Sequence, residues 1–416
     1  MRTWNHDRSS PAGTGTRMKK YLASGLPAGI FAVGLILWGT GLLSRESALA
    51  LAGRTLPILL FVLAMTVVTE LADNAGLFNF LTSRLARWGT PRVPGPVSTG
   101  RIMILWLLVV ALATLSTVFL SLDTTAVLVT PLVVQLARHA RIPPLAFALT
   151  TAWLANTASM FLPVSNLTNL LAQHQLDTTP LGFFGLLWAP ALVGVVVPLA
   201  FLALIFRKDL RGRYQSPPAH QVRDRALLWI SAVTLALLLP ALVTGIPVAI
   251  PASIAAAFLL LVFLIRRRSA VKWAMVPVQP LLLTLGLFLV VATLHDHGLG
   301  TALARVAGSG DSLPSLLQLA TAGAVSANTI NNLPAYLALE TQADSSVRLA
   351  ALLIGVNLGP LISPWASLAT LLWHARLKSM GITISWSRFV LAGLCLVVVL
   401  IPAAVLALWL SAGMPS

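Results

Sequence analysis

Long apolar runs separated by short polar stretches dominate the pattern of hydrophobic and polar positions along this chain. The uninterrupted runs lie at residues 22–43, 56–71, 181–206, 226–243, 248–265, 278–294 and 389–410. A helix needs about 20 such residues to cross the hydrocarbon core of a bilayer, so the pattern predicts membrane spans. Residues 77–88 instead place Arg84 and Arg87 on one side of an apolar stretch, which predicts an amphipathic helix lying in the membrane interface.

Two stretches about two hundred residues apart are copies of each other. Residues 156–171 align without a gap on residues 357–372, and Asn, Pro and three Leu coincide. Polar residues and proline interrupt both copies in the same place, so we predict broken helices at residues 144–172 and 349–373. Polar backbone at membrane depth survives only where it is buried in protein or lines a wet cavity. Paired breaks of this kind are the best sequence indication of a transporter's substrate site.

Two further apolar runs, at residues 102–137 and 313–339, are each interrupted by polar residues. Arg101 precedes the first run, and Arg138 and Arg141 follow it, so both of its ends favour the cytoplasm. A hairpin that enters and leaves on one side satisfies these charges, whereas a single crossing does not. We therefore predict a re-entrant hairpin in each half of the chain.

The order span, span, hairpin, broken span, span thus occurs twice. With the amino terminus inside and the carboxyl terminus outside, all but four of the 28 Lys and Arg are cytoplasmic, the exceptions being Arg45, Arg54, Arg305 and Arg348. This asymmetry makes the two halves antiparallel and predicts an all-α integral membrane protein, an inverted-repeat secondary transporter. The predicted parts are a tail (1–21), a first repeat (22–206), a basic loop with a linking helix (207–247), a second, inverted repeat (248–410) and a tail (411–416).

Composition supports a membrane protein. The chain is 57% hydrophobic and only 10% charged, with a mean hydropathy of +0.87, which excludes a soluble domain. A formal charge of +16 would normally indicate nucleic acid, but the basic residues lie in short clusters between apolar runs, so no nucleic-acid partner is expected. The single cysteine, Cys395, excludes an internal disulfide and a multi-thiolate metal site, and no metal or other cofactor is expected. Because the chain lacks a GxxxxGK[ST] loop, it does not itself hydrolyse nucleotide and is predicted not to be an enzyme.

Asp123 is the strongest candidate for ion coupling. Residues 123–128 at the first hairpin tip align with residues 332–337 at the second, which pairs Asp123 with the neutral Asn332. A carboxylate in the middle of an apolar run is costly unless it is protonated or partnered, and is by default functional. Such a group suits proton uptake and release. An alternative, compatible role is that Asp123 caps the second arm of the hairpin.

The polar side chains of the breaks and hairpin tips form the predicted substrate or ion site. These are Asp123, Thr124, Thr125, Asn156, Thr157, Ser159, Ser165, Asn166, Asn169, Asn328, Thr329, Asn331, Asn332, Asn357, Ser363, Ser367 and Thr370. Such groups can also satisfy backbone atoms that a break frees, but their duplication around two prolines favours a ligand site. The acidic residues at span ends, where solvated boundary residues are expected, are Glu70, Asp73, Asp296 and Glu340.

Several of these stretches resemble the arsenical pump membrane proteins of the ion transporter superfamily. Residues 121–131 are similar to that family's first hairpin, and residues 157–159 with 164–169 are similar to its first broken helix. Residues 331–334 are similar to its second hairpin. Its closing region is matched by residues 359–360, 367–373 and 382–386, and residues 206–209 are a further match. The resemblance runs from about residue 56 to the end. Its strings more specific to the arsenical branch are Ser-Leu-Ala-Thr-Leu-Leu-Trp at residues 367–373 and Thr-Ile-Ser-Trp at residues 383–386. The chain departs from some members at Asn156 and Asn357, where an acidic residue occurs, and in having only one span before the core span of the first repeat.

The resemblance implies export of trivalent arsenite or antimonite across the inner membrane, driven by inward proton flow, alone or with a separate cytoplasmic arsenite-stimulated ATPase. At neutral pH the trivalent oxyacid is essentially uncharged, so hydroxyls, amides and helix ends at the two breaks would bind it through hydrogen bonds. A trithiolate site cannot form with one cysteine. The alternative on the same scaffold is a Na⁺/H⁺ antiporter or an ion-coupled anion or carboxylate transporter.

Overall fold

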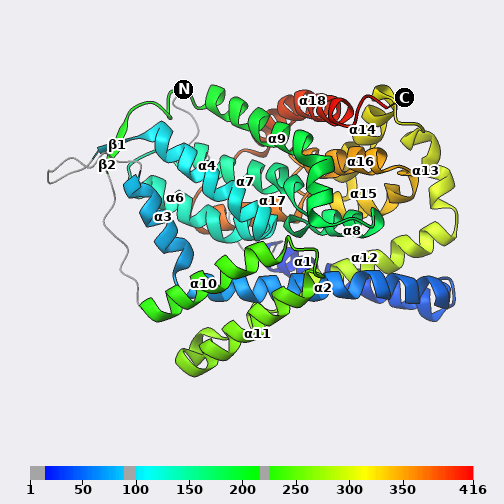
Figure 1. Cartoon of the computed structure of the whole chain (residues 1–416), viewed down its shortest axis with the longest axis horizontal. Helices are drawn as coiled ribbons and strands as arrows, with labels where there is room; N and C mark the ends of the chain where they lie inside the picture. Colours follow the sequence, from blue (N-terminus) through cyan, green and yellow to red (C-terminus); the bar gives the residue numbers. More distant parts are fainter. Residues whose placement is uncertain (1–14, 89–98, 216–223, 416) are drawn as a thin grey trace. The chain divides into compact units, whose positions relative to one another are not determined.

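The computed structural model describes residues 15–88, 99–215 and 224–415. The chain divides into two compact units, one of residues 1–52 with 277–297 and a larger one of residues 53–276 with 298–416. Almost all of the secondary structure in the described ranges is helical, as the apolar runs predict (Figure 1). The prediction of an all-α protein is therefore confirmed.

Six helices of the described part are long and apolar enough to cross a membrane. They are α2 (Arg45–Asn74), α4 (Ile102–Phe119), α9 (Pro180–Ile205), α11 (Ala249–Arg266), α12 (Val278–Asp296) and α18 (Trp386–Ser411). Shorter helices include the amphipathic α3 (Leu77–Trp88), α10 (Arg225–Ala241) and α13 (Leu299–Ala307). This set of helices is that of a multi-pass membrane protein.

In the smaller unit, α1 (Gly15–Gly39) packs along α12. The two helices approach closely at glycines, because a Cβ on Gly286 would lie only 2.5 Å from the backbone nitrogen of Phe31. Small residues of this kind let helix backbones pack tightly where the membrane offers no hydrophobic drive for association.

In the larger unit, both interrupted apolar runs fold as pairs of helices. In the first, α4 is followed after Ser121 by α5 (Leu122–Thr124), the π-helical η1 (Thr125–Val129) and α6 (Thr130–His139). In the second, α14 (Leu313–Ile330) passes through Asn331 into α15 (Asn332–Leu339) and η6 (Glu340–Gln342). Ser121 and Asn331 both have positive φ angles, of 137° and 98°, so the chain turns sharply at each.

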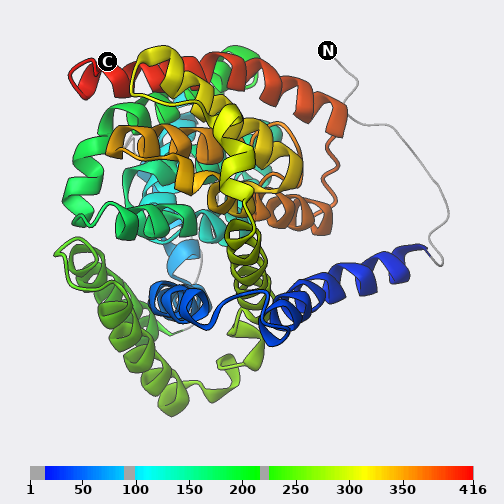
Figure 2. The ribbon, with the colours of Figure 1, turned by 90° about the vertical axis from the view of Figure 1, so that its right-hand side faces the viewer.

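The two aligned stretches are also broken at equivalent residues. The first consists of α7 (Leu145–Thr157), η2 (Ala158–Phe161), η3 (Pro163–Ser165) and α8 (Leu167–Gln175), and the second of α16 (Ser346–Leu358) and α17 (Leu368–Ser379). Helices α7 and α16 are both 13 residues long and end at aligned positions, and α8 and α17 begin at aligned positions. The long helices that follow, α9 and α18, both have 26 residues and lie side by side (Figures 1 and 2).

Glycines let helices of the larger unit approach the second break. Gly355 of α16 and Gly359, which directly follows this helix, both face α14. A Cβ on Gly355 would lie 2.2 Å from the carbonyl oxygen of Ala320. Gly393 of α18 likewise faces the carbonyl of Leu361 within the break. The close approach of α14 and α16 fixes the helical turn that carries Asn357 (Figure 1).

A short antiparallel pair of strands, β1 (Thr99–Arg101) and β2 (Arg213–Gln215), was not predicted from the sequence. Tyr214 attaches it to α3, because its hydroxyl donates a 2.7 Å hydrogen bond to the carbonyl oxygen of Ala86. Burial raises the pKa of the Tyr214 hydroxyl to about 12. Segments of three residues are too short to give a recognisable period-two pattern.

Candidate functional site

Asn357, near the end of α16, lies at the centre of a buried hydrogen-bond network that joins the two breaks. Its Oδ1 accepts hydrogen bonds from Asn166 Nδ2 at 2.8 Å and from Thr168 Oγ1 at 3.0 Å. Its Nδ2 donates to Asn169 Oδ1 at 2.7 Å. All four residues are buried. Thr168 was not predicted from the sequence, although it lies in the same polar stretch as its two asparagine neighbours.

Backbone carbonyls of the first break fix the orientation of these amides. Asn169 Nδ2 donates to the carbonyl oxygens of Ser159 at 2.7 Å and Leu162 at 3.3 Å, so the other terminal atom of this side chain is an oxygen. That oxygen accepts from Asn357 Nδ2, which leaves Asn357 Oδ1 as the acceptor for the two remaining donors. The polar ends of both asparagines are therefore occupied within the protein.

Three further side chains extend the network to α17. Ser165 Oγ donates to the same two carbonyls of the first break, and Ser159 Oγ donates to the carbonyl of Asn156 at 2.7 Å. Asn156 Nδ2 donates to the carbonyl of Ala152 at 3.1 Å and reaches Thr370 Oγ1 of α17 at 3.5 Å. Predicted site residues from both halves of the chain thus belong to one polar core.

Asn328, at the end of α14, holds the second break in shape. Its Nδ2 donates to the carbonyl of Gly359 at 2.8 Å, and its Oδ1 accepts from the backbone nitrogen of Ser363 at 2.8 Å. Its own carbonyl accepts from Ser363 Oγ at 2.9 Å and from Trp365 Nε1 at 2.8 Å. The hydrogen-bonding groups of Asn328 and Ser363, both predicted as ligand residues, are used in this structure to shape the break.

The second hairpin tip is attached to the same break. Asn331 Nδ2 donates to the carbonyl of Trp365 at 2.9 Å, and the backbone nitrogen of Asn332 donates to the carbonyl of Ala366 at 2.9 Å. Thr329, by contrast, is exposed and donates only to a carbonyl of its own helix. The structure therefore does not bring Thr329 to the polar core.

At the first hairpin tip, Ser121 is the helix cap. Its Oγ accepts a hydrogen bond from the backbone nitrogen of Thr124 at 3.2 Å, so the alternative that Asp123 caps this arm is wrong. Asn331 is the corresponding cap of the second tip, so the tips match at Ser121 and Asn331. The aligned pair of Asp123 and Asn332 is one position out of register, because sequence identity does not report where each helix begins.

Three buried oxygens of predicted site residues have no hydrogen-bond partner in the described ranges. They are Asp123 Oδ1, Thr157 Oγ1 and Ser367 Oγ. Ser367 precedes α17 without capping it, whereas the aligned Asn166 accepts from a backbone nitrogen of α8 at 3.4 Å. Helix α17 packs against α5, η1 and α7, the elements around Asp123 and Thr157. Buried oxygens without a partner require an explanation, and a hydrogen-bonding ligand is one that fits these three.

Two charged residues that the sequence places at solvated boundaries are largely buried. Glu340 is 9% exposed and forms a bidentate ion pair with Arg54, at 2.9 Å and 2.6 Å. Arg348, predicted to lie outside, is 1% exposed. The apolar pattern cannot reveal this, because both residues lie at helix ends where solvent is the default expectation.

An apolar pocket elsewhere in the described ranges offers few polar groups. An apolar cavity of about 580 Å³ lies between α10 and α11 and is lined almost entirely by hydrophobic side chains, including Trp229 and Phe258. Within residues 15–88, 99–215 and 224–415, no group of three or more His, Cys, Asp or Glu side chains could hold a metal ion. The polar core at the breaks remains the candidate site.

Comparison with known proteins gives matches over most of the chain. A family model described as citrate transporter matches residues 17–353. The arsenical pump membrane protein of Escherichia coli K12 is 31% identical over 384 residues, covering 84% of this chain and 85% of the relative. That of Yersinia enterocolitica is 29% identical over 378 residues, covering 84% and 85%, and a putative one of Bacillus subtilis is 23% identical over 390 residues, covering 83% and 84%.

A solved structure shares the fold. The YdaH transporter of Alcanivorax borkumensis superposes with a TM-score of 0.56 at 17% sequence identity, and the match covers 89% of each chain. At this identity the likeness extends to the fold alone. It places the helices of this chain in the architecture of a membrane transporter.

Proposed function

The chain belongs to the arsenical pump membrane proteins, within the citrate transporter family, and on that premise we propose that it exports arsenite and antimonite across the inner membrane in exchange for protons. It is a multi-pass membrane transporter and not an enzyme. The substrate, the exchanged ion and the residues that handle them form the proposal. The proposal includes export by this chain alone or together with a separate cytoplasmic arsenite-stimulated ATPase.

The set of unpaired oxygens on α17 and on the elements that pack against it carries the substrate proposal. The trivalent oxyacid is uncharged at neutral pH and presents hydroxyls that both donate and accept hydrogen bonds. Thr157 and Ser367 offer hydroxyls that do the same, and Asp123 offers a carboxylate oxygen that accepts. Buried unsatisfied groups that a bound ligand satisfies discriminate strongly against ligands lacking the matching group.

Asp123 is the proposed proton carrier. It lies on a hairpin tip within an apolar run, and its second-half counterpart by helix register is an apolar residue, so this pair of tips offers one titratable group. A rival sodium-coupled mechanism needs bare oxygen ligands, which hard cations require. At the first break, the carbonyls of Ser159 and Leu162 already accept hydrogen bonds from Asn169 and Ser165. These two carbonyls are therefore less available to sodium, and the sodium dependence of transport tests the rival mechanism.

A second candidate substrate is a carboxylate such as citrate. The family model is described as citrate transporter, and α17 begins at Ser367 without a side-chain cap, which leaves helix N–H groups free to receive an anion. Competition separates the two. If the protein is a carboxylate carrier, excess citrate should block its transport of a labelled carboxylate. If the protein is an arsenite exporter, excess citrate should leave arsenite export unchanged.

We further propose that the two halves have inverted topology, with re-entrant hairpins at residues 102–137 and 313–339. The equal lengths of α7 and α16, of α4 and α14, and of α9 and α18 support a repeat. Cysteine labels at Gln215 and Arg267 are expected to react only from the cytoplasm, and a label at Asp177 only from outside. Labelling of positions 215 and 177 from the same side would contradict the topology.

Expression of the protein is expected to protect cells against arsenite and antimonite but not against arsenate. The trivalent acids are neutral and match the hydroxyl groups of the site, whereas arsenate is an anion that would meet the Asp123 carboxylate. Growth of a host lacking arsenate reductase and its own arsenite exporter measures this. Protection against arsenate, or against lithium and sodium but not arsenite, would contradict the proposed function.

A further inference from the structure

Two arginines of the larger unit are shielded from solvent but are held in different ways. Arg348 lies in the first turn of α16, and Arg54 lies on α2. Neither belongs to the polar core described above. The contrast between their partners indicates which of the two contacts can open during transport.

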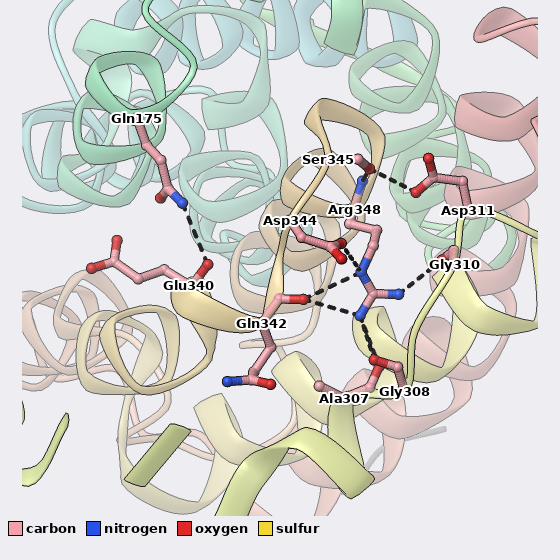
Figure 3. Close-up of polar contacts among 10 residues, drawn as sticks. All are labelled: Gln175, Ala307, Gly308, Gly310, Asp311, Glu340, Gln342, Asp344, Ser345 and Arg348. Atoms are coloured by element: carbon pink, nitrogen blue, oxygen red, sulfur yellow. Dashed lines mark hydrogen bonds and ion pairs between the residues drawn. The ribbon is translucent and has the colours of Figure 1, made fainter. Parts of the chain in front are cut away.

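Arg348 is enclosed by backbone carbonyls (Figure 3). Its Nε donates to the carbonyl of Gln342 at 3.2 Å, one terminal nitrogen to Gly310 at 2.9 Å, and the other to Gly308 at 2.7 Å and Gln342 at 3.1 Å. Asp344 adds an ion pair at 3.0 Å. Opening this cluster would leave several buried polar groups without hydrogen-bond partners at once, which is costly. The cluster therefore holds η6, the segment that contains Glu340, in place.

Arg54 has only one strong partner. Its two terminal nitrogens reach the two carboxylate oxygens of Glu340 at 2.9 Å and 2.6 Å, and one of them also reaches the carbonyl of Leu171 at 3.4 Å. Its Nε has no partner in the described ranges. The Arg54 and Glu340 side chains are 23% and 12% exposed, so both charges can become hydrated if they separate.

This ion pair joins three segments that are distant in sequence. Arg54 comes from α2, Glu340 from η6, and Leu171 from α8, whose last residue, Gln175, also donates weakly to the carbonyl of Glu340 at 3.4 Å (Figure 3). The beginning of α8 is held by the Asn357 network. Helix α8 is therefore held at one end by buried amides and at the other by long hydrogen bonds to Arg54, to Glu340 and to the Tyr336 hydroxyl, which donates to Gln175 Oε1 at 3.4 Å.

We propose that Arg54 and Glu340 form a gate that is closed in this structure and opens once in each transport cycle. Opening releases the far end of α8 from α2 and η6, while the Arg348 cluster keeps η6 itself in shape. The inference rests on the proposed transport function, because the gate has meaning only for a ligand that enters and leaves at the breaks. It assigns Arg54 and Glu340 as positioning residues, not as substrate ligands.

Reversible cross-linking tests the gate. Arg54→Cys with Glu340→Cys, on a Cys395→Ser background, is joined by a reducible bifunctional methanethiosulfonate whose spacer spans the original ion pair. Arsenite uptake into everted vesicles is measured before cross-linking, after it and after reduction. The initial rate is expected to fall about tenfold or more on cross-linking and to recover on reduction, since conformational steps limit many transport and catalytic cycles.

The matched control is a cross-link within the fixed platform. Ser345 Oγ donates to Asp311 Oδ1 at 2.6 Å beside Arg348, so Ser345→Cys with Asp311→Cys joins two segments that are not expected to separate. That cross-link should leave the rate unchanged. An unchanged rate in the Arg54–Glu340 cross-linked protein would overturn the gate.

Arg54→Lys with wild-type Glu340 provides a second test if the double variant fails to fold. The gate predicts that this variant has a faster transport cycle or a raised leak of arsenite, at unchanged arsenite affinity. An unaltered cycle and an unaltered leak would also overturn the gate. Loss of arsenite transport in the unmodified protein would instead contradict the proposed function.

Discussion

Asp123→Asn is expected to abolish the accumulation of arsenite against its gradient while leaving the protein folded. Asparagine resembles a permanently protonated aspartate in shape and charge, so it cannot deliver a proton to one side of the membrane and collect it from the other. Downhill exchange of substrate needs no proton transfer and should persist. The expected loss of uphill transport is complete within the sensitivity of the assay.

The structure removes the main structural explanation for such a loss. Ser121 caps the hairpin arm, and Asp123 Oδ1 has no hydrogen-bond partner in the described ranges, so the substitution breaks no hydrogen bond of that oxygen. Asp177→Asn is the matched control, because Asp177 is exposed in a loop with φ of 47°, a conformation that asparagine also tolerates. Both variants should express and melt like the wild type in detergent.

Uphill arsenite accumulation by a well-expressed Asp123→Asn protein would remove this residue from the mechanism. The remaining acidic candidates would then be Glu70, Asp73, Asp296 and Glu340. Of these, Glu340 is already neutralised by Arg54, which makes it the least suited to carry a proton.

Asn357→Leu is expected to eliminate transport and to destabilise the protein. The substitution leaves Asn166 Nδ2, Thr168 Oγ1 and Asn169 Oδ1 buried without their partner. Each such group costs about 1–3 kcal/mol, so the free energy of unfolding should fall by about 3 kcal/mol or more. The same change removes all three of these hydrogen bonds between the first break and α16.

Thr329→Val is the matched control for this variant. Thr329 was predicted as a site residue from its place at a hairpin tip, but it is exposed and donates only to its own helix. Its replacement by an isosteric side chain should leave both melting and arsenite transport near wild type. A stable, active Asn357→Leu protein, or an inactive Thr329→Val protein, would contradict the arrangement of the polar core.

The breaks could be predicted from the sequence because they combine strong local signals. Proline at residues 163 and 364, asparagine at aligned positions and surrounding apolar runs leave few alternatives to a broken membrane helix. The structure agrees with the alignment in detail, since α7 and α16 stop, and α8 and α17 start, at matching residues. These features depend on backbone chemistry that a short window of sequence contains.

The partners within the site could not be predicted in the same way. Whether an asparagine binds a ligand or a neighbouring carbonyl depends on contacts across nearly two hundred residues, as for Asn169 and Asn357. The hairpin register was predicted one residue out, because capping at Ser121 and Asn331 is set by φ angles and not by residue identity. Glu340 appeared to be a boundary residue because its partner, Arg54, is 286 positions away.

The protein is expected to export a neutral metalloid acid in exchange for protons. The most direct measurement is uptake of radiolabelled arsenite into everted membrane vesicles, with and without an imposed pH gradient and with sodium varied. We expect accumulation that requires an acidic vesicle interior, collapses when a protonophore is added and does not change with sodium. Accumulation that follows the sodium gradient, or no arsenite uptake under any gradient, would contradict the account.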